Sequence, residues 1–106
     1  MKHISAALFA QKYIENDWGH TDSYILDVRE EKEWEILHLP GSLLIPLQTL
    51  PERLHELKQD STLYVLCAHG VRSVHAAHFL QSQGYSEIIH VDEGIFAVSA
   101  YIERLK

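Results

Sequence analysis

The sequence has only one cysteine, Cys67, among its 106 residues. A single thiol cannot form an internal disulfide, which fits a chain that works in a reducing compartment. No apolar run approaches the ~20 residues that a membrane-spanning helix needs. The first residues, MKHISAALFAQKY, contain a short apolar stretch but no adequate signal-peptide core and cleavage site. We therefore take the chain as mature, expect it in the cytoplasm, and expect no membrane partner.

Positive charge is also scarce. Nine Lys and Arg against 15 Asp and Glu give a formal net charge of −6, and the basic residues form no cluster. Binding to nucleic acid requires a basic face, so this balance argues against it. The 46% hydrophobic content suffices for a compact core, and no segment is polar enough to predict disorder. Because separate cores need roughly 100 residues each, we expect a single domain over residues 1–106.

Apolar segments alternate with turn signals along the chain, and their periodicity predicts alternating strands and helices. Strands are expected at 23–28, 42–47, 62–67 and 87–91. Helices are expected after the N-cap candidate Ser5, within 30–37, after the capping-box sequence TLPE at 49–52, over 73–83, and from 95 to the C-terminus, where the apolar face is Ile95, Val98, Ile102 and Leu105. This alternation predicts an α/β fold with a mostly parallel central sheet and helices on both faces.

Cys67 ends the apolar segment TLYVLC and precedes a short loop and a helix. In parallel sheets, ligands bind beyond the carboxyl ends of the strands, which is where this thiol would lie. Backbone N–H groups of the loop and of the helix N-terminus would point at the sulfur and stabilise an anion. Gly70 permits the tight backbone path, and Arg72 adds positive charge. We therefore interpret Cys67 as an activated nucleophile rather than a small hydrophobe that completes a core strand.

Three segments resemble the single-domain rhodanese family of sulfurtransferases, and together they span nearly the whole chain. The sequence DVRE at 27–30, followed by EW at 33–34, matches the family's D-V-R-E…E-[FWY] segment. The sequences HLPGS at 38–42 and IPL at 45–47 are similar to its H-[IL]-P-G-A…I-P segment. The sequence CAHGVRS at 67–73 matches the C-x-x-G-x-R-S active loop. The resemblance implies a rhodanese-like fold.

The same resemblance implies a function. Cys67 would carry sulfane sulfur as a persulfide, from thiosulfate or a persulfide donor to a thiol or cyanide acceptor, without a metal or organic cofactor. The loop that binds the donor would consist of Ala68, His69, Gly70, Val71 and Arg72, whose amides stabilise the outer sulfur. His69 either donates a hydrogen bond to the incoming anion or faces solvent. Asp27 and Arg29 would support the site by tuning its charge or, the interpretation that we favour, as a structural ion pair.

Loop length separates this function from its alternatives. Four residues lie between Cys67 and Arg72, whereas Cys-dependent phosphatases of related fold have one more, and the shorter loop suits a sulfur substituent. A small phosphatase or arsenate reductase therefore ranks third, behind a sulfurtransferase and behind a non-enzymatic sulfur-relay or partner-binding module. His75 and His78, with Cys67 and His69, could be drawn as zinc ligands. The chain lacks an HxxxH or C-x-x-C element, so we predict no metal site.

The sequence departs from the family pattern near the active loop. Where the family has E-G-G-I-x-A-W, residues 92–98 read DEGIFAV, so that Glu93 replaces a glycine and Val98 the tryptophan. Leu37 stands where the family has a glycine before the histidine, and Ala68 occupies a loop position that is often cationic or bulky in the family. We expect these differences to affect the pocket rim and the choice of donor, and to leave the fold and the nucleophile in place.

Overall fold

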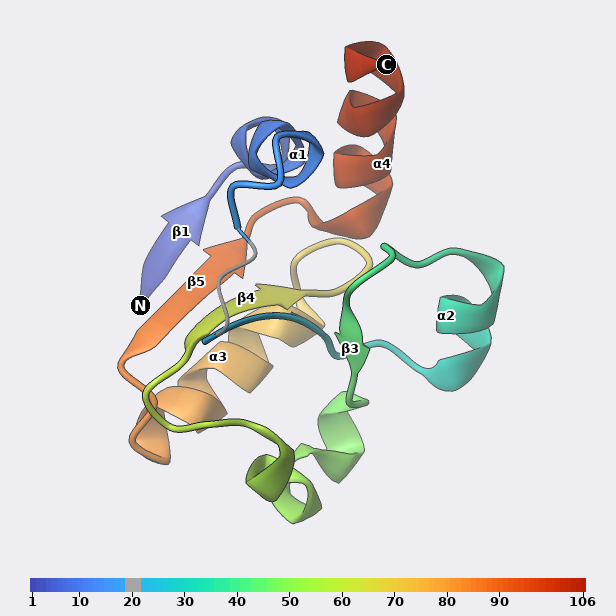
Figure 1. Ribbon diagram of the computed structural model, residues 1–106. Helices are drawn as coiled ribbons and strands as arrows, with labels where there is room; N and C mark the ends of the chain where they lie inside the picture. The colour runs from blue at the N-terminus through green and yellow to red at the C-terminus, as the bar shows by residue number, and fades with distance from the viewer. Residues whose placement is uncertain (19–21) are drawn as a thin grey trace.

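The computed structural model describes residues 1–18 and 22–106, and it contains a five-stranded sheet whose neighbouring strands all run parallel (Figure 1). The strands lie in the order β1-β5-β4-β2-β3. Along the chain the elements are β1 (Lys2–Ile4), α1 (Ala6–Ile14), β2 (Ser23–Asp27), α2 (Glu31–Ile36), β3 (Leu43–Leu44), the 3₁₀ turns η1 (Leu47–Glu52) and η2 (Leu54–Glu56), β4 (Thr62–Leu66), α3 (Arg72–Ser82), β5 (Glu87–Val91) and α4 (Gly94–Leu105). The predicted α/β fold with a parallel central sheet is confirmed.

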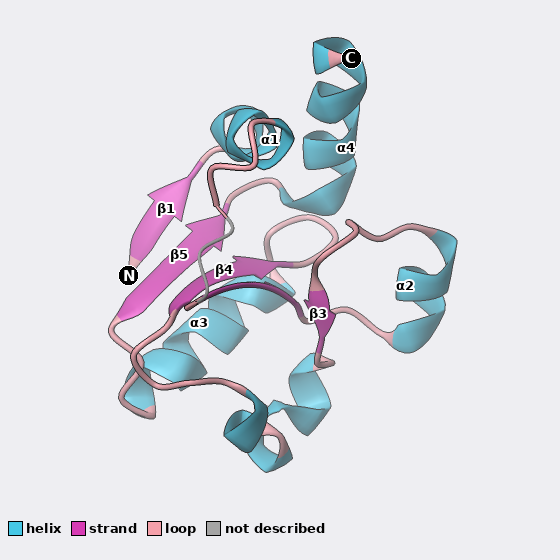
Figure 2. Cartoon of the chain, viewed as in Figure 1, coloured by secondary structure: helices cyan, strands magenta, loops and turns pink. Residues whose placement is uncertain are grey.

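Helices cover both faces of this sheet (Figure 2). Helices α1 and α4 lie side by side on one face, and α3 lies on the other with the 3₁₀ turns at its end (Figures 1 and 2). No helix in the described part of the chain is long and apolar enough to cross a membrane. Because each face is covered, the strands between them carry apolar side chains on both sides, as the run of apolar residues in 62–67 predicted.

The alternation of side chains along β4 determines which way the cysteine points. Leu63 and Val65 enter the core beneath α3, whereas Tyr64 and Leu66 enter the core beneath α1 and α4. Cys67 follows directly and continues the alternation, so its side chain lies on the α3 side with Leu63 and Val65. Each fully buried aliphatic side chain contributes roughly 1.5–3 kcal/mol to folding. The strand that presents the thiol is thereby anchored in both cores.

Several predicted elements form as expected. Ser5 caps α1, since its Oγ accepts a hydrogen bond from the Leu8 N–H at 3.1 Å. Gly84 ends α3 with a positive φ of 94°. In α4, Ile95, Val98 and Ile102 are buried as predicted, but Leu105, which we also expected on the apolar face, is 48% exposed in the last turn.

Two predicted elements are wrong, and one was missed. The TLPE sequence does not open an α-helix: it lies within η1, and Thr49 Oγ1 donates to the Pro46 carbonyl at 2.9 Å instead of accepting from the helix backbone. The strand expected at 42–47 is limited to β3, because the 3₁₀ turn η1 already begins at Leu47. The missed element, β1, has one buried residue, Ile4, and depends on pairing with β5.

A buried ion pair joins the end of β2 to the end of α2. Asp27 and Arg29 are both fully buried. The Arg29 guanidinium donates from Nε to both Asp27 carboxylate oxygens, at 3.0 and 3.1 Å, and from Nη2 at 2.8 Å. The same Nη2 donates to the Leu37 carbonyl at 2.6 Å, just beyond α2. The pair therefore holds the end of α2 against the sheet.

Replacing Asp27 with Asn should strongly destabilise the fold, because the Arg29 charge would stay buried without a counter-charge. We expect a loss of about 3–5 kcal/mol in the free energy of unfolding, measured by urea denaturation at constant m-value. The control is Asp22→Asn, since Asp22 pairs with Lys58 on the surface at 3.6 Å. That variant should lose less than about 1 kcal/mol. Equal losses in the two variants would show that burial of the first pair is unimportant.

Candidate functional site

The thiol of Cys67 lies at the carboxyl end of β4, in the loop that leads to α3. The residue is only 1% exposed. Its Sγ accepts a hydrogen bond from the Gly70 N–H at 3.1 Å and lies 3.2 Å from Ser73 Oγ. The Cys67 carbonyl accepts from the Ile95 N–H at 2.9 Å, which ties this strand end to the start of α4. The sulfur thus has a fixed position and a backbone donor suited to a thiolate.

The start of α4 supports the loop from beneath. Gly94 has a φ of 82°, and a Cβ at this position would overlap the backbone of Ala68 and His69. Glu93, which stands where the family pattern has a glycine, adopts a left-handed φ of 70°. Its Oε1 accepts from the Ala6 N–H at 2.9 Å, at the first turn of α1. The glycine that the close approach requires is therefore present, and the substituted one has gained a cap for α1.

The predicted loop residues divide into two groups. Gly70, with a φ of 87°, turns its amide toward the sulfur, and Ala68 is buried against α4. His69 and Val71 face outward, and Val71 is 66% exposed. The His69 ring stacks on Phe96 from α4 with ring centroids 5.3 Å apart. The loop therefore presents one imidazole and one apolar side chain beside the buried thiol.

Arg72 makes a two-pronged ion pair with Glu33 from α2. Its Nη1 and Nη2 donate to the two Glu33 oxygens at 2.6 and 2.8 Å. The hydrogen bonds from Arg72 lower the pKa of Glu33 to about 2, and the same contact raises the pKa of Arg72. Glu33 Oε1 also accepts from the Glu30 N–H at 3.0 Å, which caps α2. The glutamate of the DVRE…EW segment is thus the partner of the loop arginine.

Asp27 and Arg29 affect the site indirectly, because they position helix α2. Their side chains bind each other, and Arg29 also donates to the carbonyls of Leu37 and, at 3.5 Å, Glu33. This contact positions the helix that carries the Glu33 side chain, which in turn holds Arg72. The two residues form a structural pair behind the site, and their hydrogen bonds go to α2 rather than to the Cys67 loop.

A polar hydrogen-bonded chain that the sequence did not predict starts at the cysteine. Ser73 Oγ lies 2.7 Å from His90 Nε2, and His90 Nδ1 lies 2.7 Å from Asp92 Oδ1. His90 is only 3% exposed. The available signal was a histidine inside the otherwise apolar segment IIHV of β5. Its contact with Ser73, and through it with Cys67, could not be predicted from the sequence, because it depends on β5 lying beside β4.

The same cluster contains the donor atoms best placed to hold a cation. Those of His3, His90 and Asp92 all lie within 4.8 Å of one another in the described part of the chain. Both histidines already direct Nδ1 at Asp92 Oδ1, at 2.9 Å from His3 and 2.7 Å from His90. We therefore interpret the cluster as a hydrogen-bonded network. His75 and His78, considered above for zinc, are exposed on α3 and lie outside it.

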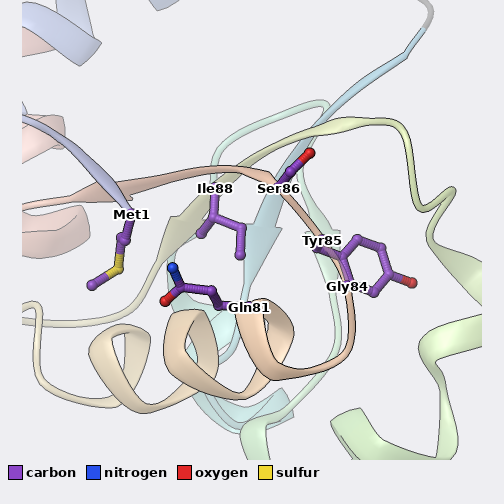
Figure 3. Close-up of a pocket in the computed structure, with 6 residues that line it drawn as sticks. All are labelled: Met1, Gln81, Gly84, Tyr85, Ser86 and Ile88. Carbon is purple, nitrogen blue, oxygen red and sulfur yellow. The ribbon is translucent and has the colours of Figure 1, made fainter.

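A surface hollow at the other end of the sheet is not part of this site. Figure 3 shows it between the end of α3 and the start of β5, with the lining residues Met1, Gln81, Gly84, Tyr85, Ser86 and Ile88. These residues precede β1 and β5 or lie at their amino ends, whereas Cys67 follows the carboxyl end of β4. Ligand sites of parallel sheets lie at the carboxyl edge, which favours the loop around Cys67.

Comparison with known proteins identifies the family of the chain. Residues 6–101 match the family described as Rhodanese-like domain. The chain is 38% identical to the putative sulfur carrier protein YrkF of Bacillus subtilis (strain 168) over 87% of its own length and 48% of that protein. It is 31% identical to the putative sulfurtransferase YtwF of the same organism, over 92% of this chain and 89% of that protein. The chain thus spans about half of one relative and most of the other.

More distant matches extend over the full fold. The chain is 28% identical to the thiosulfate sulfurtransferase GlpE of Pseudoalteromonas translucida (strain TAC 125), over 99% of this chain and 96% of that protein. The crystal structure of a rhodanese-like domain protein from Staphylococcus aureus superposes with a TM-score of 0.80 at 30% identity, covering 92% of this chain and 91% of that one. The similarity therefore extends over nearly the whole chain.

The Glu33–Arg72 pair should make stability depend on pH in the acid range. The pKa of Glu33 is about 2 in the folded chain against an ordinary 4.5. A lowered pKa stabilises the fold fully above about pH 4.5, and this stabilisation is lost as pH falls toward 2. Urea denaturation should show Glu33→Gln less stable than the wild type at pH 7, by no more than about 1 kcal/mol because the pair is partly exposed. The difference should shrink toward pH 2.

The control for this titration is Glu35→Gln, which removes an exposed carboxylate from the same helix. Its stability difference from the wild type should stay small from pH 7 to pH 2. A Glu33→Gln difference that is constant over this range would contradict the lowered pKa.

Proposed function

The chain belongs to the family of rhodanese-like domains, and on this premise we propose that it transfers sulfane sulfur as a persulfide on Cys67. Relatives named as sulfurtransferases and as a sulfur carrier support a transferase. The observation that carries the proposal is the Cys67 sulfur itself, which follows a central strand and accepts the Gly70 N–H at 3.1 Å. We take residues 1–106 as one such domain. A thiol that must stay reduced suits a cytoplasmic location.

The proposed reaction has two halves. The Cys67 thiolate attacks the outer sulfur of thiosulfate or of a persulfide, and the bond between that sulfur and the rest of the donor breaks. Sulfite or a thiolate leaves, and the charged outer sulfur stays on the enzyme as a persulfide. The Gly70 amide and the start of α3 favour this negative charge. A thiolate or cyanide then attacks the outer sulfur and restores the Cys67 thiolate. The reaction needs no metal or organic cofactor.

Loop geometry supports sulfur over phosphate as the transferred group. The loop from Cys67 to Arg72 is short, and its second residue, Ala68, is buried against Gly94. A loop with one amide fewer than that of the phosphatases has less room for a tetrahedral group. We therefore place phosphatase and arsenate reductase activity behind sulfur transfer.

A sulfur-relay module is the second candidate, and exposed apolar side chains favour it. Val71 lies in the loop itself, and Phe96, packed on His69, is 51% exposed. Apolar groups beside a nucleophile offer a contact surface to a partner protein that delivers or receives sulfur. In this role the donor or acceptor is a protein persulfide or thiol, and free thiosulfate is a poor substrate.

Thiosulfate should leave the protein one sulfur atom heavier, and cyanide should remove that mass again. Intact-protein mass spectrometry measures both steps. Cys67→Ser should show neither, because the chain has no other cysteine. Sulfur loading in that variant would place the nucleophile elsewhere and overturn the proposal. Loading from a persulfide donor without loading from thiosulfate would favour the relay function over a thiosulfate sulfurtransferase.

Arg72→Ala should slow loading from thiosulfate and from glutathione persulfide by a similar factor. Both Nη atoms are bound to Glu33, so the guanidinium holds the loop rather than reading the donor's charge. We expect a loss in kcat/KM of roughly tenfold or more for each donor, since a charged hydrogen bond contributes about 1.5–3 kcal/mol.

Glu33→Gln distinguishes the two roles of the arginine, because they predict changes of opposite sign. If Arg72 holds the loop through Glu33, this variant also loses activity with both donors. If Arg72 binds the sulfonate oxygens of thiosulfate, freeing it from Glu33 lowers the KM for thiosulfate, which would contradict our assignment. Glu35→Gln again serves as the control.

A further inference from the structure

A hydrogen-bonded chain leads from the buried thiol to the partly exposed Asp92 at the end of β5, and the sulfur transfer proposed above assigns it no role. It runs from Cys67 Sγ to Ser73 Oγ at 3.2 Å, to His90 Nε2 at 2.7 Å, and from His90 Nδ1 to Asp92 Oδ1 at 2.7 Å. We propose that Ser73 and His90, oriented by Asp92, form a proton relay that removes the thiol proton of Cys67 and returns it after sulfur transfer. This inference rests on the proposed function of Cys67.

Burial makes a relay useful at this site. Cys67, Ser73 and His90 are each at most 3% exposed. Solvent scarcely reaches the thiol, so at neutral pH a protein group within hydrogen-bonding distance is the direct route for its proton. Three elements each contribute one member of this hydrogen-bonded series: Cys67 from the end of β4, Ser73 from the first turn of α3, and His90 from β5.

Each hydrogen bond from Cys67 through Ser73 to His90 and Asp92 can have its donor on the side of the thiol. Burial opposes ionisation of Asp92, but hydrogen bonds from His3 and His90 outweigh it and keep the pKa of Asp92 below its ordinary 3.8. A carboxylate only accepts, so the contact with Asp92 places a proton on His90 Nδ1, and in the neutral ring Nε2 is then free to accept from the Ser73 hydroxyl. Ser73 Oγ is then free to accept from the Cys67 thiol. The resting arrangement is thus prepared for transfer toward His90.

The arrangement is also fully bonded after the proton has moved. Protonated Nε2 donates to Ser73 Oγ and has a second acceptor in the Gly70 carbonyl, 3.2 Å away. The Ser73 hydroxyl then donates to the Cys67 thiolate, which also accepts the Gly70 N–H. Gly70 therefore stabilises both members of the thiolate–imidazolium pair: its N–H donates to the Cys67 thiolate, and its carbonyl accepts from protonated His90. The backbone needs no movement between the two states.

The thiol proton passes to Ser73 Oγ as the hydroxyl proton passes to His90 Nε2. The Cys67 thiolate then forms a bond to the outer sulfur of the donor, and the electron pair of the broken bond leaves with sulfite or a thiolate. After the acceptor nucleophile has taken the outer sulfur, Cys67 is again a thiolate. His90 returns the proton through Ser73, and no electrons are gained or lost by the protein.

Other charged groups near the relay are bound to partners of their own. His3, on β1, lies edge-on to the His90 ring at 5.3 Å and shares Asp92. Glu93 accepts from the backbone of α1, and Arg72 is held by Glu33. Among these groups, His90 alone contacts the hydroxyl that touches the thiol. In this arrangement Ser73 contacts the reacting group, and His90 is a positioning residue that acts through it.

The test is the rate at which iodoacetamide alkylates Cys67 between pH 6 and pH 10, followed by mass spectrometry. The chain has one cysteine, so the reaction reports on the relay without any sulfur donor. At pH 7, His90→Gln and Ser73→Ala should each react at least about tenfold more slowly than the wild type, at the low end of general-base effects. The difference should vanish above about pH 9.5, where an ordinary thiol ionises without help. His78→Gln, an exposed histidine on α3, is the control and should match the wild type.

The shape of the pH profile separates a relay from a structural role. Alkylation that is slowed equally at every pH would mean that His90 only packs the site, and unchanged alkylation would mean that it does not act on the thiol; either result overturns the inference. If His90→Gln does not fold, as judged by thermal melting, Ser73→Ala and Asp92→Asn provide the same reading. Failure of the wild type to load sulfur would overturn the proposed function and leave the alkylation result intact.

Discussion

The attachment of the Cys67 backbone to the first turn of α4 is the constraint on which the site depends. The Ile95 N–H binds the Cys67 carbonyl, and Gly94 packs so closely beneath Ala68 that no Cβ fits. With the strand end held in this way, the alternation along β4 turns the sulfur toward α3. The backbone conformation of the loop is then restricted, because the loop begins at this fixed point and must reach the first turn of α3 within a few residues.

Two ion pairs connect this region of the fold to helix α2. Arg29 and Asp27 are buried and link β2 to the end of α2, whereas Arg72 and Glu33 are partly exposed and link α2 to α3. The pairs differ in what they cost to break. The buried one leaves an uncompensated charge in the core, while water screens the exposed one. The first therefore belongs to the fold, and the second can adjust the loop at little cost to stability.

The polar chain behind the thiol is the least expected part of the core. Buried polar groups are costly unless each finds a partner, and here the Ser73 hydroxyl and the His90 imidazole bind each other, with the partly exposed Asp92 carboxylate as the next partner of His90. Within residues 1–18 and 22–106, no buried side-chain nitrogen or oxygen lacks a hydrogen bond. An apolar residue at position 90 would give a simpler core. That a histidine lies there, in line with Ser73 and Cys67, is why we assign it a role in the chemistry of the thiol.

Features that depend on neighbouring residues can be predicted from the amino-acid sequence. The apolar run before Cys67, the glycine in the loop and the periodicity of 73–83 predict a strand, a loop and a helix, and the ordered motifs identify the rhodanese-like fold. Only the tertiary structure decided what meets the thiol. Glu33 reaches Arg72 across 39 positions and His90 reaches Ser73 across 17. These contacts, like the pairing of β1 with β5, follow from the order of strands in the sheet. Local periodicity carries no record of that order, because it reports which face of an element is buried and not which element covers it.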